Sequence, residues 1–342
     1  MSDVFVHGCG AVSPAGWNLT ALREALSHGE PLPVKELARP GWDKPLRVRQ
    51  VPTPSPRPAF LGHARLRRAS PISHYAVAAA LEALGQDREQ LQAQGTQLGV
   101  IFCVMSGCIN YSRRFYDETL RDPATASPLV FPETVFNAPA SHLAAFLGAT
   151  ARNYTLVGDQ GTFLQGLALG ADWLANKAVD ACLVIGAEEM DWLTADAFRL
   201  FQKGFLLSEG AGALYLKRES IESIVRLASV TDAQLYSNLQ PRGQAAARMR
   251  AELPVQSKEA LLCDGLQQLP RYDAAEIAAW REWSEARLSL KTILGEGSMA
   301  AAAWQCVAAV DALQRNRYAS ACVSVVGSNQ QAIGAHFAKL KS

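Results

Sequence analysis

The chain has 342 residues, of which 49% are hydrophobic, and its 33 Lys and Arg residues nearly balance its 32 Asp and Glu residues to give a net charge of +1. This balance leaves no electrostatic footprint for nucleic acid or an anionic membrane surface, so we expect no partner of either kind. No uncharged apolar run reaches the roughly 20 residues that a membrane span needs. The start, MSDVFVHGCGAVSP, lacks the basic region of a secretory signal, so we expect a cytoplasmic protein.

The cysteines have no CxxC spacing and are odd in number, and five of them lie in apolar segments or beside small residues. The seven are Cys9, Cys103, Cys108, Cys182, Cys263, Cys306 and Cys322. This pattern predicts buried, reduced thiols rather than a disulfide framework. We expect no cofactor and no metal.

The first third of the chain mixes strand-like and helix-like segments. Val4–Val6 predicts a short strand that runs into a Gly- and Pro-rich turn, and the aperiodic residues 30–58 predict a surface excursion. Leu66–Leu84 predicts an amphipathic helix, and the apolar run Leu98–Val104 predicts a strand buried on both faces. Ser106–Leu120 is both aromatic and basic, so it is either a partly exposed helix or a segment that faces a partner or an acyl channel.

The segment Tyr154–Gly166, YTLVGDQGTFLQG, predicts a sharp elbow. Its strand ends at Gly158, a tight turn follows, and a helix runs from Phe163 to Ala175. An elbow of this kind often presents a nucleophile beside a helix N-terminus. Here the tip carries Gln160, whose amide is neither a nucleophile nor a base at neutral pH. The sequence therefore predicts the scaffold of a nucleophile without the nucleophile.

The rest of the chain repeats the alternation of strands and helices. We predict strands at 181–186, 213–216, 223–230, 260–264, 321–326 and 332–337, helices at 140–147, 243–253, 273–286 and 299–313, and a turn at 205–212. Such alternation is typical of an α/β fold with mostly parallel strands. The Ala-rich helices suit burial between two sheets, because small side chains allow close approach.

Five segments, in chain order, resemble motifs of one family. They are VHGCGAVSP at 6–14, FPETVFNAPAS at 131–141, DACLVIGAE at 180–188, GFLLSEGAG at 204–212 and KTILGEGSMAA at 291–301. The chain thus resembles the β-ketoacyl-ACP synthases of fatty acid and polyketide synthesis. The resemblance implies an α/β, thiolase-like fold whose two similar halves have mixed sheets and buried helices in αβαβα layers. We expect an N-terminal half at 1–217 and a shortened C-terminal half at 218–342, in one compact unit.

The chain departs from this family at its catalytic positions. The resemblance implies a Cys at the elbow, where Gln160 stands, and two histidines. Asp264, with a slip of one residue in the spacing, occupies the first His position, and Glu296, five residues after Lys291, occupies the second. The late Gly-Phe-Gly-Gly loop of the family reads GSNQ at 327–330.

The distribution of histidines agrees without any alignment. The six are His7, His28, His63, His74, His142 and His336, so none lies between residues 143 and 335. Ionised Asp264 or Glu296 would repel the enolate formed when malonyl-ACP loses carbon dioxide. Either carboxyl could be protonated if buried, but the sequence gives no reason to expect both to be.

Within the family, Gln at the Cys position marks chain length factors, the inactive partners of ketosynthases in type II polyketide synthase heterodimers. The resemblance implies an acyl tunnel at the interface, here beside Ile109, Ser112, Arg113, Phe115 and Tyr116. It also implies that the strand Asn153–Val157 forms the interface. The short second half and the stretch AEEMDW at 187–192 are most similar to the chain length factors of aryl polyene clusters.

Two alternatives remain open. One is a malonyl-ACP decarboxylase like the Gln-type loading ketosynthases, although those keep both histidines. The other is a homodimeric scaffold for acyl carrier proteins, for which Arg65, Arg67 and Arg68 form either a docking site or a solvated helix face. The family's lysine supports a catalytic water network. Here we expect Lys291 to pair with Glu296, Asp264 or another carboxylate, Glu209 to hold its turn, and Gln160 to bond backbone groups at the helix start.

Overall fold

Two series of five strands follow one another in the main sheet with the same order and the same directions. The computed structural model describes residues 3–89, 95–148, 152–201, 204–219, 225–237, 240–254 and 258–340. The first series is β1 (Phe5–Val12), β4 (Leu98–Val104), β5 (Asn153–Val157), β6 (Ala181–Glu188) and β8 (Gly210–Lys217). The second is β9 (Val225–Val230), β11 (Ala260–Cys263), β12 (Ala286–Leu288), β13 (Ser320–Val326) and β14 (Gln331–Lys339), with β10 (Gln234–Leu235) beside β14.

The strand order shows the repetition directly. The first series runs β5-β4-β6-β8-β1 and the second runs β12-β11-β13-β14-β9, and the two meet where Phe5 of β1 lies opposite Arg226 of β9. In each series the first two pairings are parallel and the last two are antiparallel. The expectation of mostly parallel strands was therefore wrong, whereas the mixed sheets implied by the resemblance are present. The predicted division after Lys217 falls at the end of β8 and stays a prediction.

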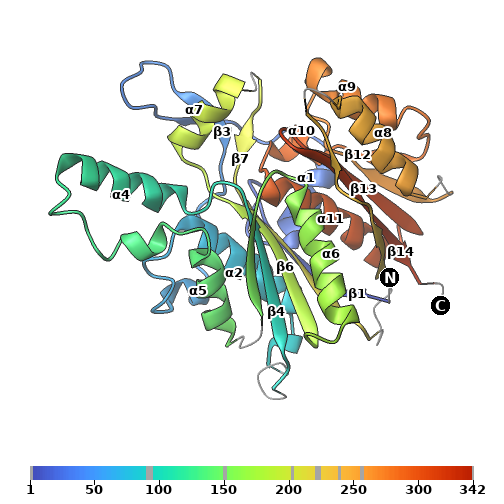
Figure 1. Ribbon diagram of the computed structural model, residues 1–342, viewed down its shortest axis with the longest axis horizontal. Helices are drawn as coiled ribbons and strands as arrows, with labels where there is room; N and C mark the ends of the chain where they lie inside the picture. Colours follow the sequence, from blue (N-terminus) through green and yellow to red (C-terminus); the bar gives the residue numbers. More distant parts are fainter. Residues whose placement is uncertain are drawn as a thin grey trace.

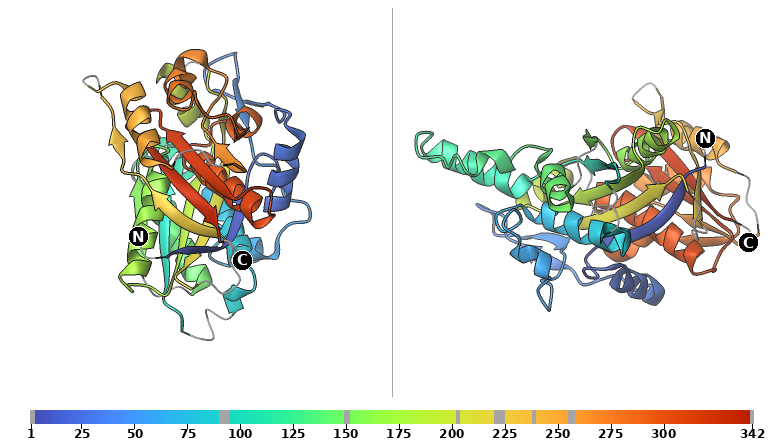
Figure 2. Two further views of the ribbon diagram at one scale, coloured as in Figure 1. Left: turned by 90° about the vertical axis from the view of Figure 1, so that its right-hand side faces the viewer. Right: turned by 90° about the horizontal axis from the view of Figure 1, so that it is seen from below.

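The helices form three layers around these strands (Figures 1 and 2). α2 (Pro71–Leu84) and α5 (Ala138–Leu147) pack outside the first series, and α8 (Arg242–Glu252) and α9 (Pro270–Ala279) pack outside the second. α6 (Thr162–Ala175) and α11 (Met299–Gln314) lie between the two series and contact strands of both. Small residues allow this close packing: a Cβ added at Gly166 of α6 would lie 2.6 Å from Cys103 Sγ. The predicted burial of the Ala-rich helix between strands is confirmed, but both series belong to one continuous sheet rather than to two sheets.

The remaining elements lie at the margins of this core. α1 (Leu19–His28) and α10 (Leu290–Leu294) contact each other, and the helix α7 (Trp192–Phe201) packs on a small sheet of β2 (Lys35–Leu37), β3 (Leu46–Arg49) and β7 (Leu207–Ser208). Residues 30–58 thus contain two strands as well as irregular chain. α4 (Ile109–Arg121) and the 3-10 helix η2 (Phe131–Glu133) form an arm that extends away from the body (Figure 1). A second 3-10 helix, η1 (Ala59–Gly62), precedes α2.

Two predicted turns are instead strands, for a packing reason. β1 continues through the glycines that the sequence suggested were a turn, because those glycines let α2 approach the strand: a Cβ at Gly8 would lie 2.0 Å from the carbonyl oxygen of Ala83. Most of 205–212 belongs to β7 and β8, and a Cβ at Gly210 would lie 2.2 Å from the carbonyl oxygen of Val12. In this chain these glycines allow neighbouring backbone segments to approach closely, and they do not reverse the direction of the chain.

Two helix boundaries differ clearly from the prediction, and one strand boundary lies outside the described residues. α2 begins at Pro71 rather than Leu66, since proline favours the first helical turn. α9 ends at Ala279 because the buried Trp280 and Trp283 fold against each other, with ring centroids 5.4 Å apart, and the chain then enters β12. The strand predicted at 223–230 is described from Val225, and residues 223 and 224 lie outside the described residues.

All seven cysteines are free and buried, as predicted. Burial raises the pKa of the thiols, and for Cys322 the pKa rises to about 11, so these groups stay protonated near neutral pH. In the described parts of the chain, no helix combines the length and the apolar character needed to cross a membrane.

The approach of α2 to β1 gives a first prediction. Gly10→Ala places a Cβ 2.2 Å from the backbone oxygen of Ala79, so the free energy of unfolding should fall by about 1–3 kcal/mol. Gly243→Ala, at a helical site where a Cβ meets nothing within 4 Å, is the matched control. Urea unfolding checks both variants, and equal stability of the two would contradict this account of the glycine.

Candidate functional site

The predicted elbow is present at the junction of β5 and α6. β5 pairs in parallel with β4, and the amide of Gly158 donates to the carbonyl of Val104 at 3.3 Å where the strand ends. α6 begins at Thr162, whose Oγ1 would lie 2.2 Å from a Cβ at position 158. Glycine is therefore required for so tight a turn. The turn carries Asp159 and Gln160 to the start of the central helix.

Gln160 at the tip is completely buried and bonds a loop from the other half of the chain. Its Oε1 accepts from the backbone amide of Ser328 at 3.0 Å, and the Ser328 hydroxyl lies 3.1 Å from both Oε1 and Nε2. The expectation that this amide would bond backbone groups at the helix start was wrong. The loop 327–330 lies over the elbow and offers a closer donor.

Asp159 holds the same loop, a role that sequence reasoning missed. Its Oδ2 accepts from the amides of Gln330 at 3.0 Å and Gln331 at 3.2 Å, and its Oδ1 accepts from the side chain of Gln331 at 2.9 Å. A Cβ at Gly327 would lie 2.3 Å from Asp159 Oδ2, so the loop follows the carboxylate closely. We call the set Asp159, Gln160, Ser328, Gln330 and Gln331 the elbow latch.

Glu296 forms a buried ion pair with Lys291. Nζ of Lys291 lies 2.8 Å from Oε2 of Glu296, and the side-chain Nε2 of Gln267 donates to the same oxygen at 2.7 Å. The other oxygen accepts from the backbone amide of Ser298 at 2.7 Å. The structure thus gives Lys291 one of the carboxylate partners considered from the sequence. Both oxygens of Glu296 bond to the protein itself.

Asp264 lies beside a second buried carboxyl, that of Glu276. Asp264 Oδ1 accepts from the amide of Leu266 at 3.2 Å, and its Oδ2 lies 3.4 Å from Nη1 of Arg287. Oε1 of Glu276 accepts from the amide of Gly265 at 3.2 Å and from the hydroxyl of Ser324. Burial raises the pKa of Asp264, and burial with the neighbouring Asp264 charge raises the pKa of Glu276 to about 7.

Further buried carboxyls lie at the end of β6, just after it, and just before β8. Glu189 accepts from the hydroxyl of Ser70 at 2.5 Å and the amide of Ile72 at 3.0 Å at the start of α2, and from the amide of Asn110 at 2.8 Å in the first turn of α4. Glu188 accepts from two amides after β4. Burial raises the pKa of Glu188 to about 8. These carboxyls hold helix starts and loops.

Glu209 holds two separate segments. Its Oε2 accepts from the amide of Met190 at 2.8 Å, and its Oε1 accepts from the amide of Val51 at 3.2 Å. Burial raises its pKa to about 7. Glu209 therefore ties the segment after β6 and the segment after β3 to its own turn, and a holding role is what the sequence suggested.

The five residues predicted to face a tunnel or partner all lie on α4, but they do not share one environment. The hydroxyl of Ser112 donates to the carbonyl of Thr134 at 3.2 Å, and the half-buried Arg113 pairs with Asp191 at 2.7 Å and Asp117 at 3.0 Å. The ring of Phe115 packs on Phe131, with centroids 5.4 Å apart. Tyr116 is 63% exposed, whereas Ile109 at the helix start is half-buried.

Large apolar side chains are exposed on the arm and on the neighbouring edge strand. We call this set the arm face. Its members are Tyr116, Leu120, Leu129, Phe131, Val135, Phe136, Tyr154 and Val157. β5 is the last strand on its side of the sheet, so its outer edge has no strand partner among the described residues. By contrast, Arg65, Arg67 and Arg68 lie exposed on a turn before α2 rather than on a helix.

The repeated strand order and the elbow define a thiolase-like ketosynthase fold, and solved structures share it. The ishigamide ketosynthase/chain length factor matches with a TM-score of 0.81 and 19% identity, covering 99% of this chain and all of that one. A β-ketoacyl synthase from Burkholderia phymatum matches with 0.80 and 16% identity over the full length of both chains. A type II polyketide synthase ketosynthase in complex with its acyl-carrier protein matches with 0.79 and 16% identity over 99% of both.

Residues 1–221 match the family of the β-ketoacyl synthase N-terminal domain. The chain therefore belongs to the β-ketoacyl synthase family. No curated protein matches it.

The elbow latch yields a prediction. Gln160→Ala leaves the half-buried amide of Ser328 without its acceptor, so the free energy of unfolding should fall by about 1–3 kcal/mol and amide exchange at Ser328 should accelerate. Hydrogen exchange read by mass spectrometry checks the loop 327–331. The exposed Gln86→Ala serves as control. Unchanged exchange in the Gln160 variant would show that the loop is held by other contacts.

Glu276 yields a pH-dependent prediction. Its pKa in the folded state, about 7, lies above the usual 4.5, so folding takes up a proton and this stabilisation is lost as pH rises through that interval. Glu276→Gln keeps an acceptor but cannot ionise. The difference in free energy of unfolding, variant minus wild type, should therefore be larger at pH 8 than at pH 5.5, by on the order of 1 kcal/mol in favour of the variant's stability. The exposed Glu30→Gln is the control, and a pH-independent difference for Glu276→Gln would refute the argument.

Proposed function

We propose that the chain is a non-catalytic chain length factor that pairs with an active ketosynthase and shapes the tunnel for the chain its partner builds. The observation that carries the proposal is the buried Gln160 at the elbow tip, bonded to Ser328. Condensation by the family's route requires a thiolate at this point. An amide held on both sides by a serine can neither attack a thioester nor accept a proton.

The second half of the site supports the same conclusion. An oxyanion or enolate is stabilised by donors aimed at it from a preorganised site. Here Glu296 supplies an acceptor instead, and its oxygens are occupied by Lys291, Gln267 and Ser298. Asp264 adds a second carboxyl, and no histidine between residues 143 and 335 could replace either group. The bonding of Glu296 within the chain supports a site that does not stabilise the intermediate.

The arm face supports a macromolecular partner. Monomeric proteins rarely expose a continuous patch of large apolar side chains, and they protect the edges of their sheets. β5 presents an open edge, and its own residues Tyr154 and Val157 are 54% and 52% exposed. α4 and η2 expose further large apolar side chains. A second ketosynthase-like chain fits this surface, because it would bring a matching edge strand. We infer an active ketosynthase, with the acyl carrier protein acting through the complex.

The finer features of the proposal concern the product. The stretch 187–192 and the short second half favour a chain length factor of the aryl polyene type, acting on a polyene chain. On α4, Arg113 is held by its two aspartate partners, so we expect it to contribute a polar surface to the tunnel. Phe115 and Tyr116, by contrast, are uncharged. Phe115 packs on Phe131 of the arm face, and Tyr116 is itself a member of the arm face. These two are the residues that we expect to limit chain length.

Co-expression with the ketosynthase of the same gene cluster tests the partnership. We expect a stable heterodimer, and Val157→Asp should abolish copurification because it places a charge at the open edge of β5. Leu235→Asp, at a similarly exposed apolar residue on β10, should leave the complex intact. Isolation of the chain only as a soluble homodimer would contradict the proposal. So would conversion of malonyl-ACP to acetyl-ACP by the chain alone.

Substitutions on α4 test the tunnel. In the active complex, Phe115→Ala should lengthen the product and Phe115→Trp should shorten it, because the side chain's volume sets the available depth. Leu200→Ala, at an exposed position on α7, should leave the product unchanged. Mass spectrometry of the released chains reads the result. If product length is the same in all three variants, Phe115 does not limit the tunnel.

A further inference from the structure

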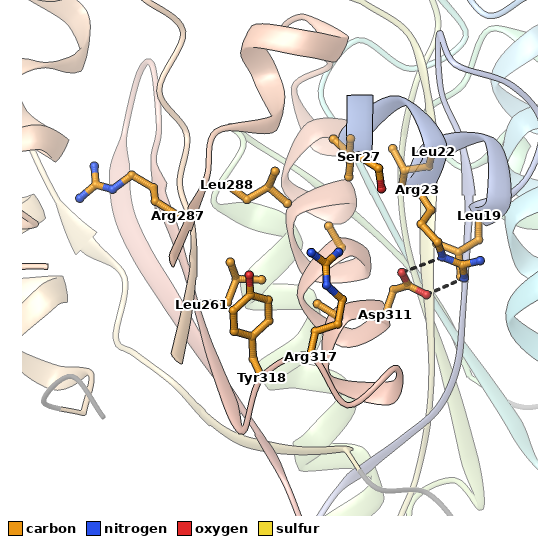
Figure 3. A pocket seen from close by; sticks show the side chains of 13 residues that line it. Leu19, Leu22, Arg23, Ser27, Leu261, Arg287, Leu288, Asp311, Arg317 and Tyr318 are labelled. Atoms are coloured by element: carbon orange, nitrogen blue, oxygen red, sulfur yellow. Dashed lines mark hydrogen bonds and ion pairs between the residues drawn. The ribbon is translucent and has the colours of Figure 1, made fainter. Parts of the chain in front are cut away.

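A hollow of about 280 Å³ lies between α1, α11 and the strands β11 and β12 (Figure 3). It shares no residue with the elbow latch or the arm face. Its floor is apolar and is made by Leu19, Leu22, Leu26, Leu261, Leu288, Ala308 and Ala312. Its rim is polar and carries Arg23, Ser27, Arg287, Asp311, Arg317 and Tyr318. The hollow therefore combines an apolar body with a charged margin.

The rim has a surplus of positive charge. Its one carboxylate, Asp311, is neutralised by Arg23, whose Nη2 and Nε lie 2.7 Å and 3.0 Å from the two oxygens. Arg287 points away from the hollow (Figure 3) and bonds the carbonyl of Trp280 at 3.1 Å. Arg317 remains: among the described residues, no carboxylate forms an ion pair with it within 4.0 Å. Its guanidinium is available to an anion.

We propose that this hollow binds a small monocarboxylate with an apolar body, such as a medium-chain or aromatic acid. The planar fork of Arg317 matches a carboxylate with two parallel hydrogen bonds. The hydroxyl of Tyr318 lies at the same end of the hollow and supplies a third donor (Figure 3). The leucines and alanines of the floor take the apolar body out of water. Because Asp311 is already paired, it does not repel the ligand.

A ligand in this position would connect distant parts of the chain. α1 belongs to the first strand-and-helix series, whereas β11, β12 and α11 belong to the second. A molecule that binds the folded state alone raises the free energy of unfolding by mass action. Binding of a free acid at this site would thus stabilise the contact between the two strand-and-helix series. It does not rest on the proposed function, because none of its residues lies at the elbow or on the arm.

Binding of sodium octanoate to the purified full-length chain tests the proposal, with octanol as the uncharged counterpart of the same length. Isothermal titration calorimetry should detect binding of octanoate and little or no binding of octanol. Arg317→Gln should weaken octanoate binding about tenfold, as expected for the loss of a charge-assisted contact. Arg317→Lys keeps the charge but not the fork and should fall between the two. Arg315→Gln removes the same charge from an exposed neighbour that does not line the hollow and should bind within about twofold of the wild type.

The outcomes separate clearly. Octanoate binding that is lost in Arg317→Gln but kept in Arg315→Gln supports the site. Absence of octanoate binding to the wild type overturns the proposal. Equal binding of octanol and octanoate, or equal weakening by the two Arg→Gln variants, also overturns it, because the first indicates simple apolar contact and the second indicates general charge. Far-ultraviolet circular dichroism of each variant verifies that it is folded.

Discussion

The contact on which the rest of the site depends is the attachment of the elbow to the loop before β14. Asp159 and Gln160 come from the first series of strands, and Ser328, Gln330 and Gln331 come from the second. The bonds from Gln331 to Asp159 are buried and the others are half-buried, so loss of a partner would leave a poorly solvated polar group unsatisfied. This latch fixes the start of α6, the central helix, relative to the opposite half. It therefore sets the relation between the two halves at the point where the family's chemistry takes place.

Buried carboxyls do much of the remaining positioning. Glu189 holds the starts of α2 and α4, and Glu209 joins the segments after β3 and β6. Glu296 with Lys291 does the same for the segment before α11. A buried carboxyl that accepts several backbone amides is expensive to desolvate but leaves those amides satisfied, which is why the loops around the site adopt one conformation. The raised pKa values of Glu188, Glu209 and Glu276 record that cost.

The sequence alone predicted those helices and strands that depend on a local residue pattern. It failed where contacts between distant segments determine the local conformation. The apolar run Leu98–Val104 is β4 with unchanged bounds, and the elbow lies where the pattern places it. The glycines of β1 looked like a turn because their purpose, close contact with α2, depends on residues about 70 positions away. The same holds for Gln160. The sequence alone showed that this residue is not a nucleophile. Its hydrogen-bond partner, Ser328, lies far away along the chain and is brought to it only by folding.

The proposed loss of catalysis is compatible with retention of the fold, because the residues at the substituted positions bond within the chain. In an active site, the polar groups must remain partly unsatisfied until the substrate supplies the missing partners. Here the amide of Gln160 bonds Ser328, and the carboxylate of Glu296 bonds Lys291, so each group finds its partner within the chain. Replacing Gln160 by cysteine would remove the bonds to Ser328 but leave those of Asp159 to Gln330 and Gln331, and it would supply no imidazole. These contacts support the proposal that the scaffold positions a partner rather than carrying out chemistry. The arm face, with its exposed apolar side chains and open strand edge, is the surface that we propose binds the second chain.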